Sequence, residues 1–216
     1  MEPTRRLGRR LACENAIFRV YLDRVVDGRG RLVENYLVVE PKLRADGRTA
    51  GVAILPVLSP EVGPSKIGLL SVFRYPIGAV SLEIPRGFME KGETEKEAAT
   101  RELSEETGLS CAPRKLLHIA NIAPEAGIIA SRCAVFAALA CRPAGRKSAE
   151  FGHGELKFYS TDEVRDLMGA MKIQDPCTLI ACSWLFSRIR SGRSGRSPSR
   201  SRAVPARKAN RRRPRS

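Results

Sequence analysis

Short apolar runs separated by polar turns fill much of the chain before residue 160. The runs 16–26 and 31–40 are rich in β-branched and aromatic residues and flank "DGRG", whose Asp-Gly start suits a tight reversal. They predict a hairpin over about residues 16–40. The Arg-rich start "MEPTRRLGRRLA" is short and contains Glu2, so we interpret it as a frayed N-terminus rather than a transit peptide.

Six further runs predict strands of a buried sheet. Three of them follow the polar turn at 42–51 and are short, apolar and rich in branched residues: "VAILPVL", "IGLLSVFRY" and "AVSLEIP". The other three are "KLLHIANIA", "CAVFAALAC" and "ELKFYS". The alanines of "CAVFAALAC" leave a helix open for that run.

Two short helices are predicted after the last strand. The first follows Ser160 or Thr161, where Glu163 completes a capping box with Ser160, and runs to about Met168. The second begins with Asp175 as N-cap and Pro176 at the first helical position, and it continues to about residue 190.

A third helix is predicted in the acidic stretch "GFMEKGETEKEAATRELSEETGL", residues 87–109. Thr94, with Glu97 three residues later, is an N-cap candidate, and Gly108 ends the pattern where a left-handed residue is needed. Two alanines and a leucine supply an apolar stripe between them. The helix therefore covers about residues 94–107.

The composition is that of one core with a small addition. The chain has 216 residues, 43% of them hydrophobic, and no apolar run reaches the eighteen or so residues of a membrane span. The start also lacks the apolar stretch of a secretory signal, so we expect a cytoplasmic protein. The six cysteines form no C-x-x-C pair, which favours reduced and mostly buried thiols over a zinc site.

The net charge of +15 is concentrated at the C-terminal end. From Arg188 to Ser216 there are twelve Lys or Arg residues and no acidic residue. Such a segment buries too little apolar surface to offset chain entropy, so we expect 191–216 to be a disordered basic tail. Two interpretations remain open: a tether for nucleic acid or an anionic membrane, or a solvated tail that binds polyanions only non-specifically.

Three carboxylates share one face of the acidic helix. Glu102, Glu105 and Glu106 are spaced i, i+3 and i+4, and like charges at that spacing destabilise a helix by about 0.2–0.5 kcal/mol per pair. A divalent cation with oxygen ligands would compensate them, and carboxylates that share Mg²⁺ or Mn²⁺ with a phosphate are usual in phosphoryl chemistry. A solvated surface helix would account for the Glu and Lys residues at 95–97, but not for three carboxylates on one face.

The same stretch resembles the box that defines the Nudix hydrolases. The matching positions are Gly87, Glu93, Arg101, Glu102, Glu105, Glu106 and Gly108, with apolar residues at 103 and 109. The resemblance implies an α/β/α sandwich with a mixed β-sheet and a metal-dependent enzyme that hydrolyses the diphosphate bridge of a nucleoside diphosphate derivative.

The resemblance also implies roles for individual residues. Glu102 and Glu106 would be the principal metal ligands, and Glu105 would be a further ligand or an organiser of the attacking water. The backbone carbonyl of Arg86 would be another ligand. Glu93 and Arg101 would form an internal salt bridge that shapes the loop and helix.

Features outside the box resemble the ADP-ribose and ADP-sugar pyrophosphatase branch. Pro124, sixteen residues after Gly108, stands where that branch carries a marker proline, and the segments before and after the box also resemble it. Arg74 is then a candidate diphosphate contact, because a guanidinium matches phosphate oxygens in a bidentate way. A surface arginine at a strand end is an equal alternative.

A general base is expected from a loop after the box. In the resembling branch it is a glutamate, and "RPAGRKSAEFGHGE" offers Glu150 and Glu155, between which the sequence does not decide. The glycines of this loop suit a closing lid as well as an ordinary surface loop. His153 is interpreted as a solvent-facing loop residue.

These inferences divide the chain into an N-terminal β-rich segment, 1–48, a hydrolase domain, 49–190, and a basic tail, 191–216. The N-terminal hairpin is too small to be stable alone. In the resembling pyrophosphatases an equivalent segment packs across a partner subunit and helps form the adenosine pocket, which implies a homodimer. Because of the basic tail, two alternatives stay open: a pyrophosphohydrolase of RNA 5′ ends, and a non-catalytic nucleotide sensor.

Overall fold

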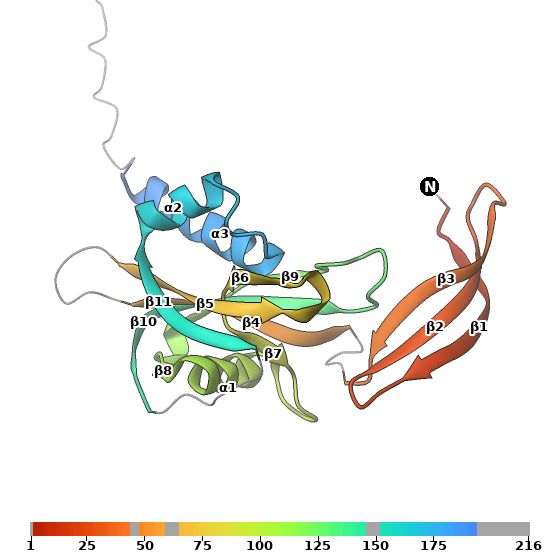
Figure 1. Cartoon of the computed structure of the whole chain (residues 1–216), viewed down its shortest axis with the longest axis horizontal. Helices are drawn as coiled ribbons and strands as arrows, with labels where there is room; N and C mark the ends of the chain where they lie inside the picture. Colours follow the sequence, from red (N-terminus) through yellow and green to blue (C-terminus); the bar gives the residue numbers. More distant parts are fainter. Residues whose placement is uncertain (1, 44–47, 59–64, 146–151, 194–216) are drawn as a thin grey trace, which may run out of the picture.

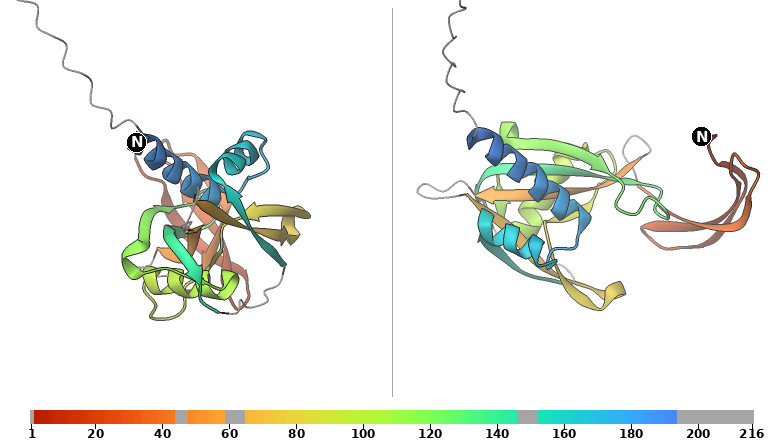
Figure 2. Two further views of the ribbon diagram at one scale, coloured as in Figure 1. Left: turned by 90° about the vertical axis from the view of Figure 1, so that its left-hand side faces the viewer. Right: turned by 90° about the horizontal axis from the view of Figure 1, so that it is seen from above.

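The computed structural model describes residues 2–43, 48–58, 65–145 and 152–193. A three-stranded antiparallel sheet comes first and consists of β1 (Arg5–Glu14), β2 (Phe18–Val26) and β3 (Leu32–Pro41), in that order. Figures 1 and 2 show this sheet projecting from the body of the molecule. The predicted hairpin corresponds to β2 and β3.

The prediction of a frayed N-terminus is wrong, because residues 5–14 form strand β1. All ten residues of β1 are exposed, so burial of apolar side chains does not explain the strand. It pairs along its length with β2. Arg9 donates hydrogen bonds of 2.8 Å from both Nε and Nη2 to the carboxylate of Asp23, a β2 residue only 4% exposed. Charged side chains with partners on the neighbouring strand therefore hold β1 in place.

The body contains a mixed β-sheet. Its main path runs β11-β5-β4-β10-β8, while β6, β7 and β9 pair with β5, β4 and β10. Strands β4 and β10 run parallel, and the other pairs are antiparallel. The strands are β4 (Thr49–Leu58), β5 (Lys66–Arg74), β6 (Ala79–Glu83), β7 (Arg86–Phe88), β8 (Leu109–Ser110), β9 (Leu116–Ile122), β10 (Arg132–Pro143) and β11 (His153–Ser160).

Helices cover both faces of this sheet, which gives the α/β/α sandwich (Figure 1). Helix α1 (Glu95–Thr107) lies on one face, where Ala98, Ala99 and Leu103 are buried. Helices α2 (Thr161–Gly169) and α3 (Pro176–Arg193) lie on the other. Each face has its own hydrophobic cluster. The sequence-based prediction of the fold class is confirmed.

The alanine-rich run 133–141 is part of a strand, and the helix left open for it does not form. Strand β10 lies between β4 and β9 and hydrogen-bonds to both. Ala134, Ala137 and Ala138 are completely buried between the layers. Small side chains there let helices pack closely on a central strand, so tertiary packing overrides the helical preference of alanine.

The predicted helix starts are present. Thr94 and Ser160 each form a complete capping box, with Glu97 and Glu163 as the third helical residues. Asp175 accepts a hydrogen bond of 2.8 Å from the backbone N–H of Thr178 and so caps α3. Gly108 ends α1 in the left-handed conformation, at φ 68°. In the described part of the chain, no helix is long and apolar enough to cross a membrane.

Candidate active site

Helix α1 presents its three clustered glutamates at different depths. Glu102 is 5% exposed and Glu106 is 3% exposed. Glu105 is partly exposed, with 42% of its side chain accessible. The i, i+4 spacing therefore buries two carboxylates against strand β7 and leaves the third at the edge of the site.

Arg101 is the cation around which these carboxylates are arranged. Its Nε lies 2.7 Å from Glu93, and its Nη1 lies 2.8 Å from Glu102 and 3.0 Å from Glu105. Its Nη2 donates a 2.9 Å hydrogen bond to the carbonyl of Phe88. The hydrogen bond to Glu93 contributes most to raising the pKa of Arg101. One guanidinium thus joins β7, the loop before α1 and the carboxylate face.

Strand β7 fits closely against the buried carboxylates. The backbone N–H of Arg86 donates a 3.1 Å hydrogen bond to Glu106. At Gly87, a Cβ atom would overlap the carboxylate of Glu102, so any side chain would displace that group. Gly51 of β4 lies behind it, and a Cβ there would be 2.7 Å from the carbonyl oxygen of Gly87. Glycine is required at 87 by this close approach, not by a positive φ.

The Glu93–Arg101 pair makes stability depend on pH. The hydrogen bond from Arg101 lowers the pKa of Glu93 below its usual value near 4.3. A lowered carboxyl pKa stabilises the folded state above the unfolded-state pKa, and this stabilisation is lost as the pH falls through the folded-state pKa. We expect the melting temperature of the wild type to fall more between pH 5 and pH 3 than that of Glu93→Gln. Glu95→Gln, which changes an acceptor for neutral Asn121, is the control and should follow the wild type.

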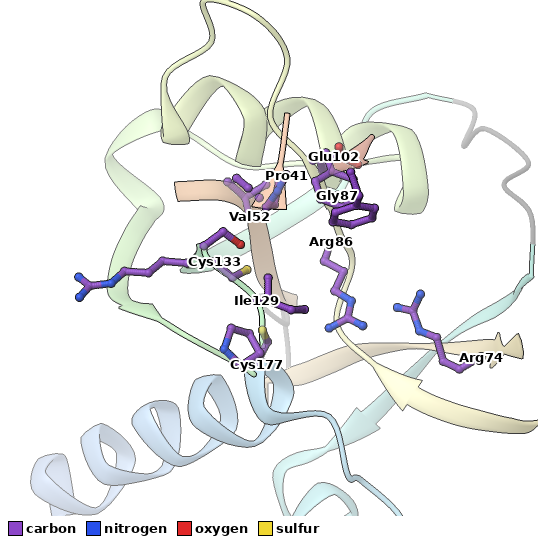
Figure 3. Close-up of a pocket in the computed structure, with 16 residues that line it drawn as sticks. Pro41, Val52, Arg74, Arg86, Gly87, Glu102, Ile129, Cys133 and Cys177 are labelled. Carbon is purple, nitrogen blue, oxygen red and sulfur yellow. The ribbon is translucent and has the colours of Figure 1, made fainter. Parts of the chain in front are cut away.

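A pocket of about 600 Å³ opens beside this carboxylate face. Strands β4, β7 and β10, the first turn of α3 and the base of the N-terminal sheet all contribute to its wall (Figure 3). Phe18 packs edge-to-face on Phe88, with ring centroids 5.6 Å apart, where the two sheets meet. The residues that line the pocket include Phe18, Pro41, Val52, Arg74, Arg86, Gly87, Glu102, Pro124, Ile129, Cys133 and Cys177.

Two arginines in this pocket are held by buried carboxylates. Arg74 binds Glu83 through Nε at 3.0 Å and Nη2 at 2.5 Å. Arg86 lies 3.1 Å from Glu83 and 2.7 Å from Asp175. Figure 3 shows the two guanidinium groups turned toward each other from different strands. Burial alone raises the pKa of Glu83, but the hydrogen bond from Arg74 and the charge of Arg86 outweigh it and hold the pKa low.

Only some of the sequence-based site residues line this pocket, and Glu105 and Glu106 are not among them. Those that line the pocket are Arg74, Arg86, Gly87, Glu102 and Pro124. Glu155 lies on β11, is exposed and forms an ion pair of 3.4 Å with Lys157, outside the pocket lining. Glu150 lies outside the described residues.

Sequence reasoning missed the side chain of Arg86 and its partners Glu83 and Asp175. Only the carbonyl of Arg86 had a predicted role. The i, i+3 spacing of Glu83 and Arg86 was a local signal for one ion pair. The approach of Asp175, 89 residues later, has no local signal.

The donor set around α1 suits a hard divalent cation. All the candidate ligands are oxygens: the carboxylates of Glu102, Glu105 and Glu106 and the carbonyl of Arg86. Among the described residues, no group of three or more Asp, Glu, His or Cys side chains is already arranged to hold a metal ion. Arg101 instead supplies the positive charge between Glu102 and Glu105. The chemistry of these oxygen donors fits Mg²⁺ or Mn²⁺.

Comparison with known proteins places this site in a family. A family model described as NUDIX domain matches residues 47–176, more than half of the chain. The chain therefore belongs to the NUDIX domain family. The matched range contains the whole α1 carboxylate face, strand β7 and both pocket arginines.

Two curated relatives match shorter segments. The ADP-sugar pyrophosphatase of Mus musculus is 44% identical over 63 residues, which are 29% of each chain. The ADP-ribose pyrophosphatase of Saccharomyces cerevisiae is 43% identical over 68 residues, which are 31% of this chain and 29% of the relative. The chain thus spans less than a third of the length of these relatives.

A solved structure shows the same fold over nearly the whole length. It is described as the crystal structure of an ADP compounds hydrolase. It has a TM-score of 0.68 and 16% sequence identity, and the match covers 90% of this chain and 97% of that chain. At this identity, the likeness concerns the fold alone.

Proposed function

We propose that this protein hydrolyses the diphosphate bridge of a nucleoside diphosphate derivative, with ADP-ribose or an ADP-sugar as substrate. AMP and a sugar phosphate are the products. The observation that carries the proposal is the position of the pocket, which has Glu102 and Gly87 on one side and Arg74 and Arg86 on another. The names of the two curated relatives support the choice of substrate.

The carboxylates of Glu102, Glu105 and Glu106 and the carbonyl of Arg86 would hold Mg²⁺, or Mn²⁺ in its place. When bound, this ion neutralises the diphosphate and lowers the pKa of a water molecule. The chain itself fixes the carboxylates: Arg101 holds Glu102 and Glu105, and the N–H of Arg86 holds Glu106. Rigid placement of charged groups is the main protein contribution to phosphoryl chemistry.

The two pocket arginines orient the substrate in this proposal. Glu83 and Asp175 fix their guanidinium groups before substrate arrives, so little side-chain entropy is lost on binding. Each guanidinium has five N–H donors and uses only some of them on these carboxylates, which leaves donors for phosphate oxygens. Glu150 and Glu155 remain the two candidates for the general base.

A substrate panel tests this function. The full chain is incubated with Mg²⁺ and, separately, with ADP-ribose, ADP-glucose, GDP-mannose, NADH, a diadenosine polyphosphate and 5′-triphosphorylated RNA. We expect ADP-ribose or ADP-glucose to have the highest kcat/KM. Rapid turnover of RNA with inert ADP-ribose would contradict the proposed branch. Tight nucleotide binding without turnover of any compound would identify a sensor instead of an enzyme.

We also propose that the protein works as a homodimer joined through its N-terminal sheet. The sheet exposes large apolar side chains, among them Leu7, Leu11, Leu32, Val33 and Leu37, each more than 40% accessible. Its contacts with the body include a 2.9 Å hydrogen bond from Tyr36 to Gly127 and backbone bonds of Val39 with residues 128 and 130. A second copy would cover this apolar surface.

The dimer is tested by placing a charge on the sheet. Sedimentation velocity of the wild type should give twice the chain mass of 23.7 kDa. Leu37→Asp should shift the protein to the monomer, because a carboxylate buried in an interface without a partner is costly. Arg29→Ala, in the turn of the same sheet, is the control and should remain dimeric. A monomeric wild type at micromolar concentration would contradict the proposal.

The basic segment after α3 lies outside the described residues. Its binding of polyanions remains a prediction, as does the division of the chain at residues 48 and 190. Helix α3 ends at Arg193, three residues beyond the predicted boundary. Removal of residues 194–216 should leave ADP-ribose turnover unchanged if the pocket is complete without them.

A further inference from the structure

Cys111 directly follows strand β8, and Cys141 lies on β10, the strand with which β8 pairs. Strands β8 and β10 are antiparallel, with Ser110 opposite Arg142 and Leu109 opposite Pro143. One more step in this register places Cys111 opposite Cys141. The two thiols are close enough for each to shift the pKa of the other. Residues opposite each other in antiparallel strands have Cα atoms about 4.5–5.5 Å apart. Disulfides span about 4.4–6.8 Å between Cα atoms, so a pair that continues this register would have the backbone spacing of a disulfide.

The two thiols differ in access and environment. Cys111 is half-buried and lines a surface depression of about 560 Å³, which also contains Lys96 and Thr100 of α1. Cys141 is 3% exposed, and its S–H donates to the carbonyl of Ala138 at 3.1 Å. The outer thiol is therefore reachable from solvent, and the inner thiol lies directly behind it.

This depression shares no lining residue with the pocket beside the carboxylates, although Arg101, which pairs with Glu102 and Glu105, forms part of its wall. With 100° per residue along a helix, Lys96 and Thr100 lie on average about 120° around α1 from Glu102 and Glu106. The pocket beside the carboxylates has its own pair of thiols, Cys133 and Cys177, on β10 and α3. Those two elements are not neighbouring strands, so no strand register sets the spacing of that pair.

We propose that Cys111 and Cys141 form a modification site for hydroperoxides, which convert the pair to a reversible disulfide. Neither thiol has a role in the proposed hydrolysis. The bond would join the segment after α1 to β10 and close a loop of about thirty residues.

The reaction balances with a hydroperoxide as the two-electron oxidant. The Cys111 sulfur attacks one peroxide oxygen, the O–O bond breaks, and Cys111 becomes a sulfenic acid. The Cys141 sulfur then attacks the Cys111 sulfur and displaces hydroxide, which takes the Cys141 proton and leaves as water. With H₂O₂, two thiols and one peroxide give one disulfide and two waters.

The order of attack agrees with the surroundings of the two sulfurs. The neighbouring Cys141 thiol and the charge of Lys96 lower the pKa of Cys111, and the first of these is the larger effect. The interaction with Cys111 and burial both raise the pKa of Cys141. A thiolate is the reactive form, so the outer thiol is the one that reacts first.

The test is oxidation of the full chain carrying Cys13→Ser, a change that removes an exposed thiol able to link two molecules. After equimolar H₂O₂, we expect a mass loss of 2 Da and a single linked peptide pair containing Cys111 and Cys141. The melting temperature should rise by roughly 5–10 °C, because the bond restricts the unfolded chain. Dithiothreitol should reverse both changes.

Matched variants separate this pair from the other. Cys111→Ser and Cys111→Ala should abolish the link and the rise in melting temperature. Cys133→Ser, the same change in the pocket pair, should retain both. A link between Cys133 and Cys177 with Cys111 and Cys141 still free would overturn the proposal. Conversion of Cys111 to sulfinic acid with an intact Cys141 thiol would overturn it as well. If a Cys111 variant folds poorly, the peptide map of the Cys13→Ser protein alone still shows which two cysteines are linked.

Discussion

Glu102→Gln and Glu106→Gln should each lower kcat/KM for ADP-ribose by at least about 100-fold. Mutation of an outer-shell group around a metal already costs about 10–100-fold, and these two carboxylates are proposed to contact the ion directly. Glutamine keeps the shape of the side chain, and its carbonyl oxygen still accepts the 3.1 Å hydrogen bond from Arg86 at position 106. The stability of Glu106→Gln at pH 7 should therefore differ from that of the wild type by less than about 1 kcal/mol.

The control for these variants is Glu95→Gln. It makes the same chemical change in the first turn of the same helix, where Glu95 accepts a hydrogen bond from Asn121. Its kcat/KM should stay within about twofold of the wild type, as for most surface changes. If Glu106→Gln were as active as this control, Glu106 would not be a metal ligand.

Arg101→Met should unfold more easily than any surface arginine variant. Arg101 contacts Glu93, Glu102 and Glu105, and the side chain of Glu102 is only 6% exposed. Removing one partner of a buried ion pair costs about 3–5 kcal/mol. Glu93 and Glu105 are more accessible, so we expect about 3 kcal/mol less unfolding free energy in urea. Turnover should fall as well, because the carboxylates lose their common anchor.

Arg24→Met provides the comparison. Arg24 pairs with Glu34 at 3.0 Å, and both side chains are more than half exposed. Such surface pairs are worth about 0–1 kcal/mol. An equal, small loss of unfolding free energy in Arg101→Met and Arg24→Met would contradict the role of Arg101 as the anchor of the site.

The sequence predicted α1 and its ends well because its signals are local. Thr94, Glu97 and Gly108 lie in or next to the turns that they cap, and the structure shows both the capping box and the left-handed end. The parallel pairing of β4 with β10 joins segments about 80 residues apart and was not predicted, since the family resemblance implied only a mixed sheet.

The missed features all depend on contacts between distant residues. Strand β1 has an entirely exposed, Arg-rich sequence, and only its pairing with β2 and the Arg9–Asp23 contact explain it. Likewise, the Arg86–Asp175 ion pair depends on the packing of α3 against the sheet. Spacing along the chain carries no signal for such contacts, whereas the carboxylates of one helix face are fixed by the helical repeat.

The most direct test of the account is the position of a bound metal. A crystal of the full chain, soaked in Mn²⁺ with a non-hydrolysable ADP-ribose analogue, would reveal the ion by its anomalous signal. We expect a peak bonded to the carboxylates of Glu102 and Glu106, with the diphosphate of the analogue between that ion and Arg74. Density for the ion elsewhere, with both carboxylates uncoordinated beside a bound analogue, would contradict it.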